Sequence, residues 1–201
     1  NLASLYQDQN RLSEAEPLLE EALAIRKAAL PAGHPDIASN LNNLARLYHN
    51  QNRFSEAEPL YQEALTLLKA ALPTGDLDIA SSMYNLAMLF QAQNRVLEAE
   101  PLYQDALTIY KAALPAGHRH VTSSLNNLAI LHFEQGCYVE SEKNIIELLE
   151  LKFLSCQLDH EEFKGYFDFL DVLYQIMGID DPTERVREVK NSLIENIETN
   201  R

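Results

Sequence analysis

The feature of this sequence that most constrains its fold is a repeat with a period of 42 residues. The opening segment NLASLYQDQN returns as NLARLYHNQN, NLAMLFQAQN and NLAILHFEQG, which begin at Asn43, Asn85 and Asn127. Residues 1–42 and 43–84 are identical at 27 of 42 aligned positions without a gap. Copies this similar predict one structural unit used several times, in which each copy covers the apolar face of its neighbour.

Each copy contains two stretches with the periodicity of an α-helix. In the second copy, the first stretch covers residues 36–51 and has its apolar side chains at Ile37, Leu41, Leu44, Ala45 and Tyr48. The second stretch runs to about residue 72, before a Pro-Thr-Gly breaker, and has its apolar side chains at Ala57, Leu60, Tyr61, Ala64, Leu67 and Leu68. We therefore expect two antiparallel helices in each copy.

Turn and capping residues mark the predicted helix ends. The first helix stops at Asn10, Asn52, Asn94 or Gly136, and these residue types tolerate the left-handed backbone that ends many helices. The second helix is predicted to open with a capping box, Ser55-x-x-Glu58, in which both side chains satisfy backbone donors. Pro59 would then lie in the first turn, where a missing N–H costs little. Carboxylates there are favoured by the helix dipole.

Composition agrees with helices and narrows the classes of partner. Apolar residues make up 46% of the 201 residues, only 6 of which are glycine. Acidic residues outnumber basic ones by 30 to 16, and a net charge of −14 repels nucleic acid and anionic membranes. No apolar run approaches the roughly 20 residues of a membrane span, and no signal-peptide pattern opens the chain. We therefore expect neither a nucleic-acid nor a membrane partner.

The cysteines indicate the cellular compartment, and the first residue indicates where the natural N-terminus lies. Cys137 and Cys156 are too few for a disulfide framework and lack metal-ligand spacing, which favours a reducing, cytoplasmic compartment. Because the sequence starts inside a repeat, we expect the natural start to lie further upstream.

The repeat resembles the tetratricopeptide repeat, whose pattern of small and large residues is present as Leu41-x-x-Leu44-Ala45-x-x-Tyr48 and Ala57-x-x-x-Tyr61-x-x-Ala64. The 42-residue period and the wording NNLA...LY...Q.R..EAEPLY..AL are most similar to repeats of the kinesin light chain type, which also occur in bacterial proteins. The resemblance covers about residues 1–150 and implies an all-α, right-handed solenoid of antiparallel helix hairpins. It departs from the family in three respects: the period exceeds the common 34, the usual Trp is replaced by Leu41, Met83 or Leu125, and the fourth copy has Lys143, Ser141 and Leu148 where the family has Pro and small Ala residues.

Beyond Lys152 the repeat pattern is no longer readable. Two further helices are predicted, from Asp159 to about Met177 and from Thr183 to about Glu198, with a turn at residues 178–182. We expect residues 1–155 to form the repeat array, with a truncated first unit and a degenerate fourth, and residues 156–201 to form a C-terminal helical cap. The sequence leaves open whether these helices cap the stack or occupy its groove.

No pattern typical of catalysis is visible. The sequence contains no glycine-rich phosphate loop, GxSxG, HExxH or paired-cysteine motif. His118-x-His120 is the one close histidine pair; we place it in an interhelix loop, where a metal would need further ligands. His132 stands where other copies have Tyr6 and Tyr48 and is interpreted as a residue at the edge of the core. We therefore predict no enzyme activity, no metal and no cofactor.

The polar side of each first helix is the candidate binding surface. The resemblance implies that first helices line the concave wall of the solenoid, which would bring Asn1, Asn43, Asn85 and Asn127 into one row. An Asn amide both donates to and accepts from a peptide backbone, and apolar side chains beside it, including Phe133, are typical of recognition surfaces. The predicted peptide-binding residues are Asn43, Asn85, Asn127, Asn42, Asn126, Arg46, Ser39, Tyr84, Met88 and Ile130.

We interpret the chain as an interaction scaffold that binds an extended peptide or a partner helix in this groove. Kinesin light chains, which it resembles, recognise acidic, Trp-containing peptides, and this requires basic groove residues. Here Arg46 is the basic residue of the inferred groove, and its equivalents are Ser4, Met88 and Ile130. The predicted ligand is therefore neutral or basic, with a large apolar side chain.

Three alternatives remain open from the sequence. In the first, the Asn residues simply solvate the surface or bond to the neighbouring repeat. In the second, the chain is a self-assembly module that pairs through Leu2, Leu5 and Tyr6 of its truncated first helix. In the third, it is the sensor segment of a larger signalling protein.

Overall fold

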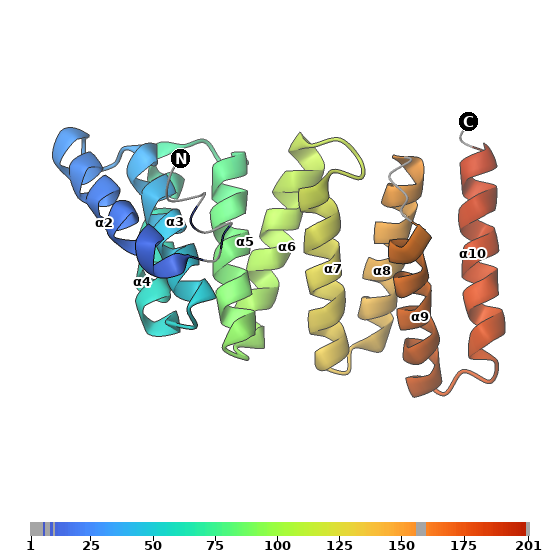
Figure 1. The fold of residues 1–201 in the computed structure, drawn as a ribbon. Helices are drawn as coiled ribbons and strands as arrows, with labels where there is room; N and C mark the ends of the chain where they lie inside the picture. The colour runs from blue at the N-terminus through green and yellow to red at the C-terminus, as the bar shows by residue number, and fades with distance from the viewer. Residues whose placement is uncertain (1–5, 7–8, 10, 156–159, 200–201) are drawn as a thin grey trace. The chain divides into compact units, whose positions relative to one another are not determined.

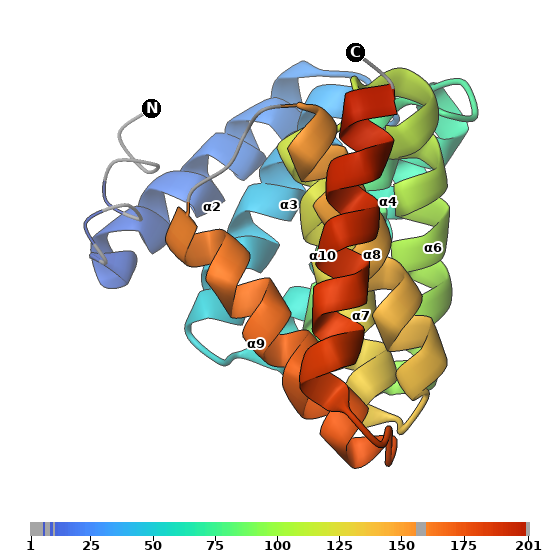
Figure 2. The same cartoon turned by 90° about the vertical axis from the view of Figure 1, so that its right-hand side faces the viewer.

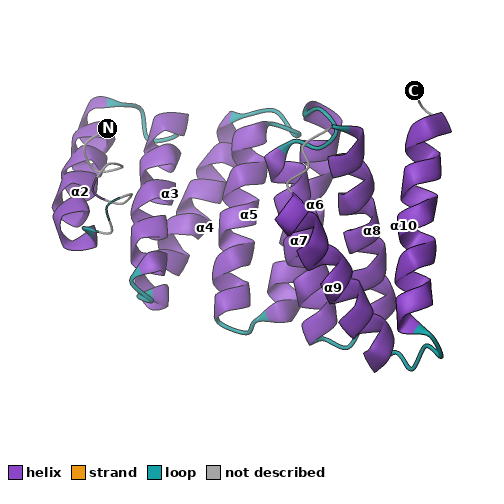
Figure 3. Ribbon diagram, turned by 45° about the vertical axis from the view of Figure 1, so that its right-hand side comes forward, coloured by secondary structure: helices purple, strands orange, loops and turns teal. Residues whose placement is uncertain are grey.

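The structure is a computed structural model that describes residues 6, 9, 11–155 and 160–199 (Figure 1). Figure 3 shows helices joined by loops in this part of the chain, as an all-α class predicts. The helices are α2 (Leu12–Ala29), α3 (Pro35–Asn50), α4 (Phe54–Ala71), α5 (Leu77–Ala92), α6 (Val96–Ala113), α7 (Arg119–Glu134), α8 (Tyr138–Leu154), α9 (His160–Ile176) and α10 (Pro182–Thr199). The predicted fold class, an all-α solenoid of helix hairpins, is confirmed.

The chain forms two compact units, residues 1–109 and residues 110–201. In the first unit, α3 and α4 form a hairpin, α2 packs on α3, and α5 packs on α4 and α3. Ala45, Ala57 and Ala64 are completely buried where these helices meet, and Ala87 is buried in the same way on α5. The predicted alternation of small and large apolar residues is therefore the packing interface of the hairpins.

Left-handed Asn residues end the first helices, as the sequence predicts. Asn52 and Asn94 both have φ of 59°. Immediately after each turn, the N–H of Arg53 donates to the carbonyl of Tyr48 (2.9 Å) and the N–H of Arg95 to that of Phe90 (2.8 Å). These bonds satisfy carbonyls that the ending helix would otherwise leave open.

The predicted capping box at the second helix is wrong. Helix α4 begins at Phe54, so Ser55 is its second residue, and the N-cap residue Arg53 makes no side-chain capping bond. Pro59 is consequently the sixth helical residue and lies beyond the first turn. The Glu58 carboxylate accepts from side chains instead, from Arg95 Nη1 at 2.6 Å and from Gln62 Nε2 at 3.1 Å.

Each turn arginine instead links its repeat to the preceding one. Arg53 Nη1 lies 2.8 Å from Glu16 Oε1, and its guanidinium lies 4.1 Å above the ring of Tyr48. Its Nε also bonds Glu56 at 2.7 Å, which lowers the pKa of that carboxyl. Arg95 repeats this arrangement with Glu58, Glu98 and Phe90. The recurrent glutamates at the starts of the second helices are therefore ion-pair partners of arginine, whereas the sequence was interpreted as giving them a capping role.

The second unit is built on the α7–α8 hairpin, with α9 packed on α8 and α10 packed on both α8 and α9 (Figure 2). The two helices predicted beyond Lys152 are thus confirmed with bounds close to those expected. A single apolar cluster joins the four helices through Ala129, Ile145, Leu149, Leu170, Leu173, Tyr174, Val189 and Leu193.

Helix α9 keeps the 42-residue register that the sequence no longer shows. Leu170 and Leu173 are buried, as are Leu128 and Leu131 42 residues earlier. Gly178 has φ of 71° and lies 42 residues after Gly136, which has φ of 76°. Helix α10 begins 44 residues after α8, so the last turn has two additional residues. The division into an array to residue 155 and a cap from residue 156 stays a prediction.

Candidate functional site

In the first unit, some of the predicted binding residues on α3 form hydrogen bonds within the protein. The Ser39 hydroxyl donates to the carbonyl of Pro35 at 3.3 Å. The Oδ1 of half-buried Asn42 accepts a hydrogen bond from Ser82 on α5 at 3.2 Å. For Asn42, this supports the alternative in which the amide bonds to the next repeat. Asn43 beside it is also half-buried.

The cation of Arg46 is already engaged within the protein. Arg46 is exposed, has an interaction partner in the chain, and acts electrostatically on the buried hydroxyl of Tyr61. Burial raises the pKa of Tyr61, and the Arg46 charge partly opposes this shift. An acidic ligand would therefore have to compete for the basic residue predicted in this groove.

On α5, the predicted site becomes more apolar. Tyr84 is half-buried and packs edge-on against Tyr103 of α6, with ring centroids 5.5 Å apart. Asn85 is half-buried next to it, and Met88 keeps 37% of its surface exposed. Asn43 and Asn85 belong to the first unit and Asn127 to the second, so a single row through all three stays a prediction.

In the second unit, two predicted residues line a hollow that is open to solvent, called the cavity below. Asn126 and Ile130 of α7 lie around a hollow of about 230 Å³, together with Ile145, Gly165, Tyr166 and Phe169. Apart from the Asn126 amide and the Tyr166 hydroxyl, these side chains are apolar. Asn127 is half-buried and has an interaction within the chain. The cavity is large enough for one sizeable apolar side chain and offers an amide at its edge.

Sequence reasoning missed the contribution of α9 to this surface. Phe169 lies 42 residues after Asn127 and contacts Phe133, with ring centroids 5.3 Å apart. Val172 lies 42 residues after Ile130 and is 47% exposed. Continuing the count of 42 beyond residue 152 would have identified both, but the repeat wording there is lost.

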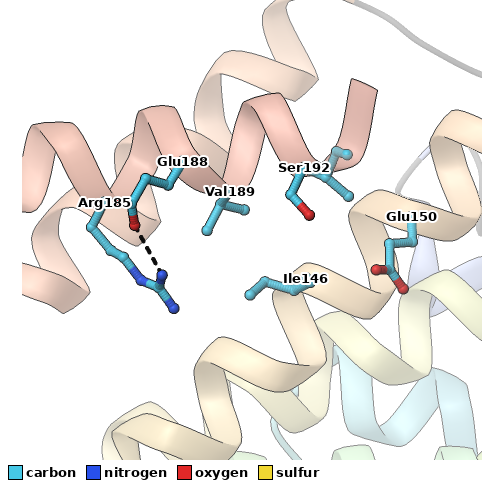
Figure 4. A pocket seen from close by; sticks show the side chains of 7 residues that line it. Ile146, Glu150, Arg185, Glu188, Val189 and Ser192 are labelled. Atoms are coloured by element: carbon cyan, nitrogen blue, oxygen red, sulfur yellow. Dashed lines mark hydrogen bonds and ion pairs between the residues drawn. The ribbon is translucent and has the colours of Figure 1, made fainter. Parts of the chain in front are cut away.

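A second hollow of about 260 Å³ lies between α8 and α10 (Figure 4). Its apolar lining comes from Ile146, Val189 and Leu193, and its rim includes the Arg185–Glu188 ion pair at 3.0 Å. Arg185 also lies 3.7 Å from Glu142, which accepts a hydrogen bond from the Tyr174 hydroxyl. These contacts fasten α10 to the α7–α9 part of the unit. None of the predicted site residues lines this hollow.

The histidines have structural roles. His118 is the N-cap of α7 and its Nδ1 accepts the His120 N–H at 3.3 Å. His120 therefore lies inside α7 and not in the loop where it was predicted. His132 is buried and its Nδ1 lies 2.9 Å from the Asn144 amide nitrogen, which fits a core residue. Among the described residues, no three His, Cys, Asp or Glu side chains are grouped to hold a metal ion.

Burial makes two histidines sensitive to acid. Burial lowers the pKa of His49. Burial also lowers the pKa of His120, and the nearby charges of His118 and Arg119 lower it further. The fold therefore favours the neutral form of both histidines, whereas the unfolded chain takes up protons near pH 6.5. Stability from these groups is full above about pH 6.5 and is lost as the pH falls below that value.

We therefore expect the urea concentration at the unfolding midpoint of the wild type to decrease when the pH is lowered from 8 to 5.5. The His49→Gln, His120→Gln double variant should show a smaller fall over the same range. An identical pH dependence in the wild type and the double variant would contradict this assignment.

Several predicted residues lie outside the described part of the chain. These are Asn1, Leu2, Ser4, Leu5, Asn10, Cys156 and Asp159. Self-assembly through Leu2 and Leu5 therefore stays a prediction. Within the described part, no helix has the length and apolar character needed to cross a membrane.

Comparison with known proteins identifies the class. Two family models described as tetratricopeptide repeat match residues 1–70 and 79–120, together more than half of the chain. The chain therefore belongs to the tetratricopeptide repeat proteins. No curated protein matches it in sequence at a significant level.

Solved structures show which members of this class share the fold. BtubC (BKLC) from P. vanneervenii is 23% identical with a TM-score of 0.77, over 96% of this chain and 78% of that protein. A Podospora anserina kinesin light chain protein with nearly identical TPR-like repeats is also 23% identical with a TM-score of 0.77, over 99% and 92%. MamA is 12% identical with a TM-score of 0.66, over 99% and 98%. The fold is thus of the kinesin light chain type, and tetratricopeptide repeats generally mediate protein–protein interaction.

Proposed function

We propose that this chain is a non-catalytic scaffold that holds a peptide segment of a protein partner on the face formed by its first helices. The observation that supports this proposal is the apolar cavity between α7 and α9, because it is lined by Asn126 and Ile130, two of the residues that the sequence predicts for binding. A large side chain of the ligand would enter the cavity beside Ile130. A cytoplasmic location is part of the same proposal.

Amides on the first helices would hold the ligand backbone. Asn85 and Asn126 are half-buried, and an amide fixed in this way loses little side-chain entropy when it binds a peptide group. The Oδ1 of Asn42 already accepts from Ser82, and Asn127 also has an interaction within the chain, so a ligand would have to add to these bonds or replace them. Asn43, Asn85 and Asn127 are the proposed backbone contacts.

The ligand should be neutral or basic. The chain has a net charge of −14, and Arg46 already interacts within the protein. Carboxylates on the ligand would lose hydration on entering the cavity without gaining a cation there, since the cavity lining contains no basic residue. Lysine or arginine in the ligand would be attracted over a longer range.

A peptide-array screen, followed by affinity measurement of the tightest peptides, tests the proposal. We expect enrichment of sequences with one large apolar residue and no excess of acidic residues. The Asn85→Ala, Asn127→Ala double variant should bind these peptides more weakly, by about tenfold, because two backbone contacts of roughly 0.5 to 1.5 kcal/mol are lost. The Gln62→Ala, Gln104→Ala variant removes two exposed amides from α4 and α6 and should bind normally.

The cavity has its own test. A side chain added at Gly165 would meet no atom within 4 Å of its Cβ, so leucine there should be tolerated by the fold and should project toward the cavity. Gly165→Leu should therefore abolish peptide binding, whereas Gly165→Ala should reduce it far less. Enrichment of acidic peptides would refute the charge argument, and binding unaffected by Gly165→Leu would refute the anchor.

A further inference from the structure

Helix α9 exposes a seam of apolar side chains along its length. Val172 and Ile176 are 47% and 48% exposed, and Ile179, just after the helix, is 37% exposed. Half-buried Phe169 begins the seam. Within the helix, Phe169, Val172 and Ile176 are separated by three and four residues, so they share one face of α9 and span about 10 Å.

This seam is continuous with the cavity proposed as the anchor site. Phe169 lines the cavity together with Ile130 of α7, which is itself 37% exposed. Val172 and Ile176 occupy the positions on α9 that Ile130 and Glu134 occupy on α7, 42 residues earlier. The apolar surface therefore extends from the cavity along α9, in place of the polar stripe seen on α3.

The spacing of the seam matches an amphipathic helix better than an extended chain. Alternate side chains of an extended peptide point to opposite faces, so only every second residue would meet the seam. A helix laid along α9 presents its own apolar residues three and four positions apart, which interdigitate with a seam of the same spacing.

The charges beside the seam select the partner. Asp168, Asp180 and Asp181 are exposed near its two ends, and Lys164 is the nearby exposed cation on α9. A second copy of this chain would bring another net charge of −14 against it, which disfavours self-pairing here. Lysine or arginine at the flanks of a partner helix would complement the aspartates.

We propose that the α9 seam binds an amphipathic, basic α-helix of a partner protein, with one of its apolar residues in the Ile130–Phe169 cavity. This inference rests on the proposed peptide-binding function and specifies the conformation and charge of the ligand.

The test uses a designed probe, an 18-residue peptide with leucine at helical positions a and d and lysine elsewhere. Three relatives serve for comparison: a scrambled sequence, a version with glutamate in place of lysine, and a version with two central prolines. The full-length protein should bind the designed peptide about tenfold or more tightly than any of the three. The circular dichroism of the mixture should show helix gained on binding.

Variants of the protein locate the contact. Val172→Gln with Ile176→Gln should lower affinity for the designed peptide by about tenfold or more. Val139→Gln changes a valine of the same 47% exposure on α8 and should have no effect. All three positions are exposed, and unchanged circular dichroism of the free proteins will show that the fold is intact.

Two results overturn the inference: equal affinity for the designed and scrambled peptides, or affinity that survives the double substitution. Failure here is distinguishable from failure of the proposed function. If array-selected peptides are blocked by Gly165→Leu but unaffected at Val172 and Ile176, the peptide-binding function holds and the seam inference falls.

Discussion

Replacing Ala45 or Ala87 by leucine should unfold the first unit at a markedly lower temperature than the wild type. Both residues are completely buried where the helices of a hairpin approach, so three additional carbon atoms have no space. Overpacking of this kind costs about 1 to 3 kcal/mol or more, and the tight packing of the hairpin places these sites at the upper end. Thermal melts followed by circular dichroism measure the change.

The matched control is Ala70→Leu on α4, because Ala70 is exposed on a helix of the same unit. Its melting midpoint should stay close to that of the wild type. Midpoints unchanged in both Ala45→Leu and Ala87→Leu would mean that the alanines do not lie at the helix contact.

Deleting residues 157–201 should give a fragment that aggregates. The deletion removes Leu170, Leu173 and Tyr174 of α9, which are buried against Ile145 and Leu149 of α8. Each large side chain of this kind stabilises the fold by roughly 1.5 to 3 kcal/mol through burial, and its loss also exposes the partner surface on α8. Size-exclusion chromatography with light scattering measures the outcome.

Two milder variants distinguish exposure of the apolar surface of α8 from the mere shortening of the chain. Leu173→Asp, with the full chain retained, should also aggregate because it places a charge in the apolar cluster. Deleting only residues 200–201 should have no effect. A soluble, monomeric fragment 1–156 would show that α9 and α10 are an appendage and would contradict the proposed cap.

The fold was predictable because the repeated sequence motif determines where the helices and turns of each repeat lie. Helical periodicity located α3 and α4 to within about one residue, and Asn52 and Asn94 marked turns that need a left-handed backbone. Four copies of the same pattern made each assignment mutually supporting.

The partners of the residues at the start of α4 were not predictable from local chemistry alone. Ser55 and Glu58 have the spacing of a capping box, but Glu58 bonds to Arg95 of the next repeat. A contact between residues 37 positions apart outcompetes a local backbone bond, and the spacing within one helix contains no information about it.

The residues around the cavity were only partly identifiable from the sequence. Asn126 and Ile130 of α7, which line it, are among the predicted binding residues, and that role stays a prediction. Phe169, Val172 and Ile176 of α9 were not predicted as binding residues. The repeat motif is no longer recognisable in the sequence of this helix, although the helix keeps the 42-residue register. What remains of the repeat in α9 is the burial of Leu170 and Leu173 and the left-handed Gly178, and burial becomes visible only in three dimensions.

The most direct test of peptide binding on the first-helix face is a methyl NMR titration with the tightest array-selected peptide. Ile130 and Ile176 report on the cavity and the seam, Ile146 on the hollow between α8 and α10, and Ile25, which is 59% exposed on α2, on a surface outside both. The account predicts shifts of the Ile130 methyl signal, accompanied by Ile176 for a helical ligand, with Ile146 and Ile25 unchanged. Shifts confined to Ile146 or Ile25, with Ile130 unmoved at saturation, would contradict it.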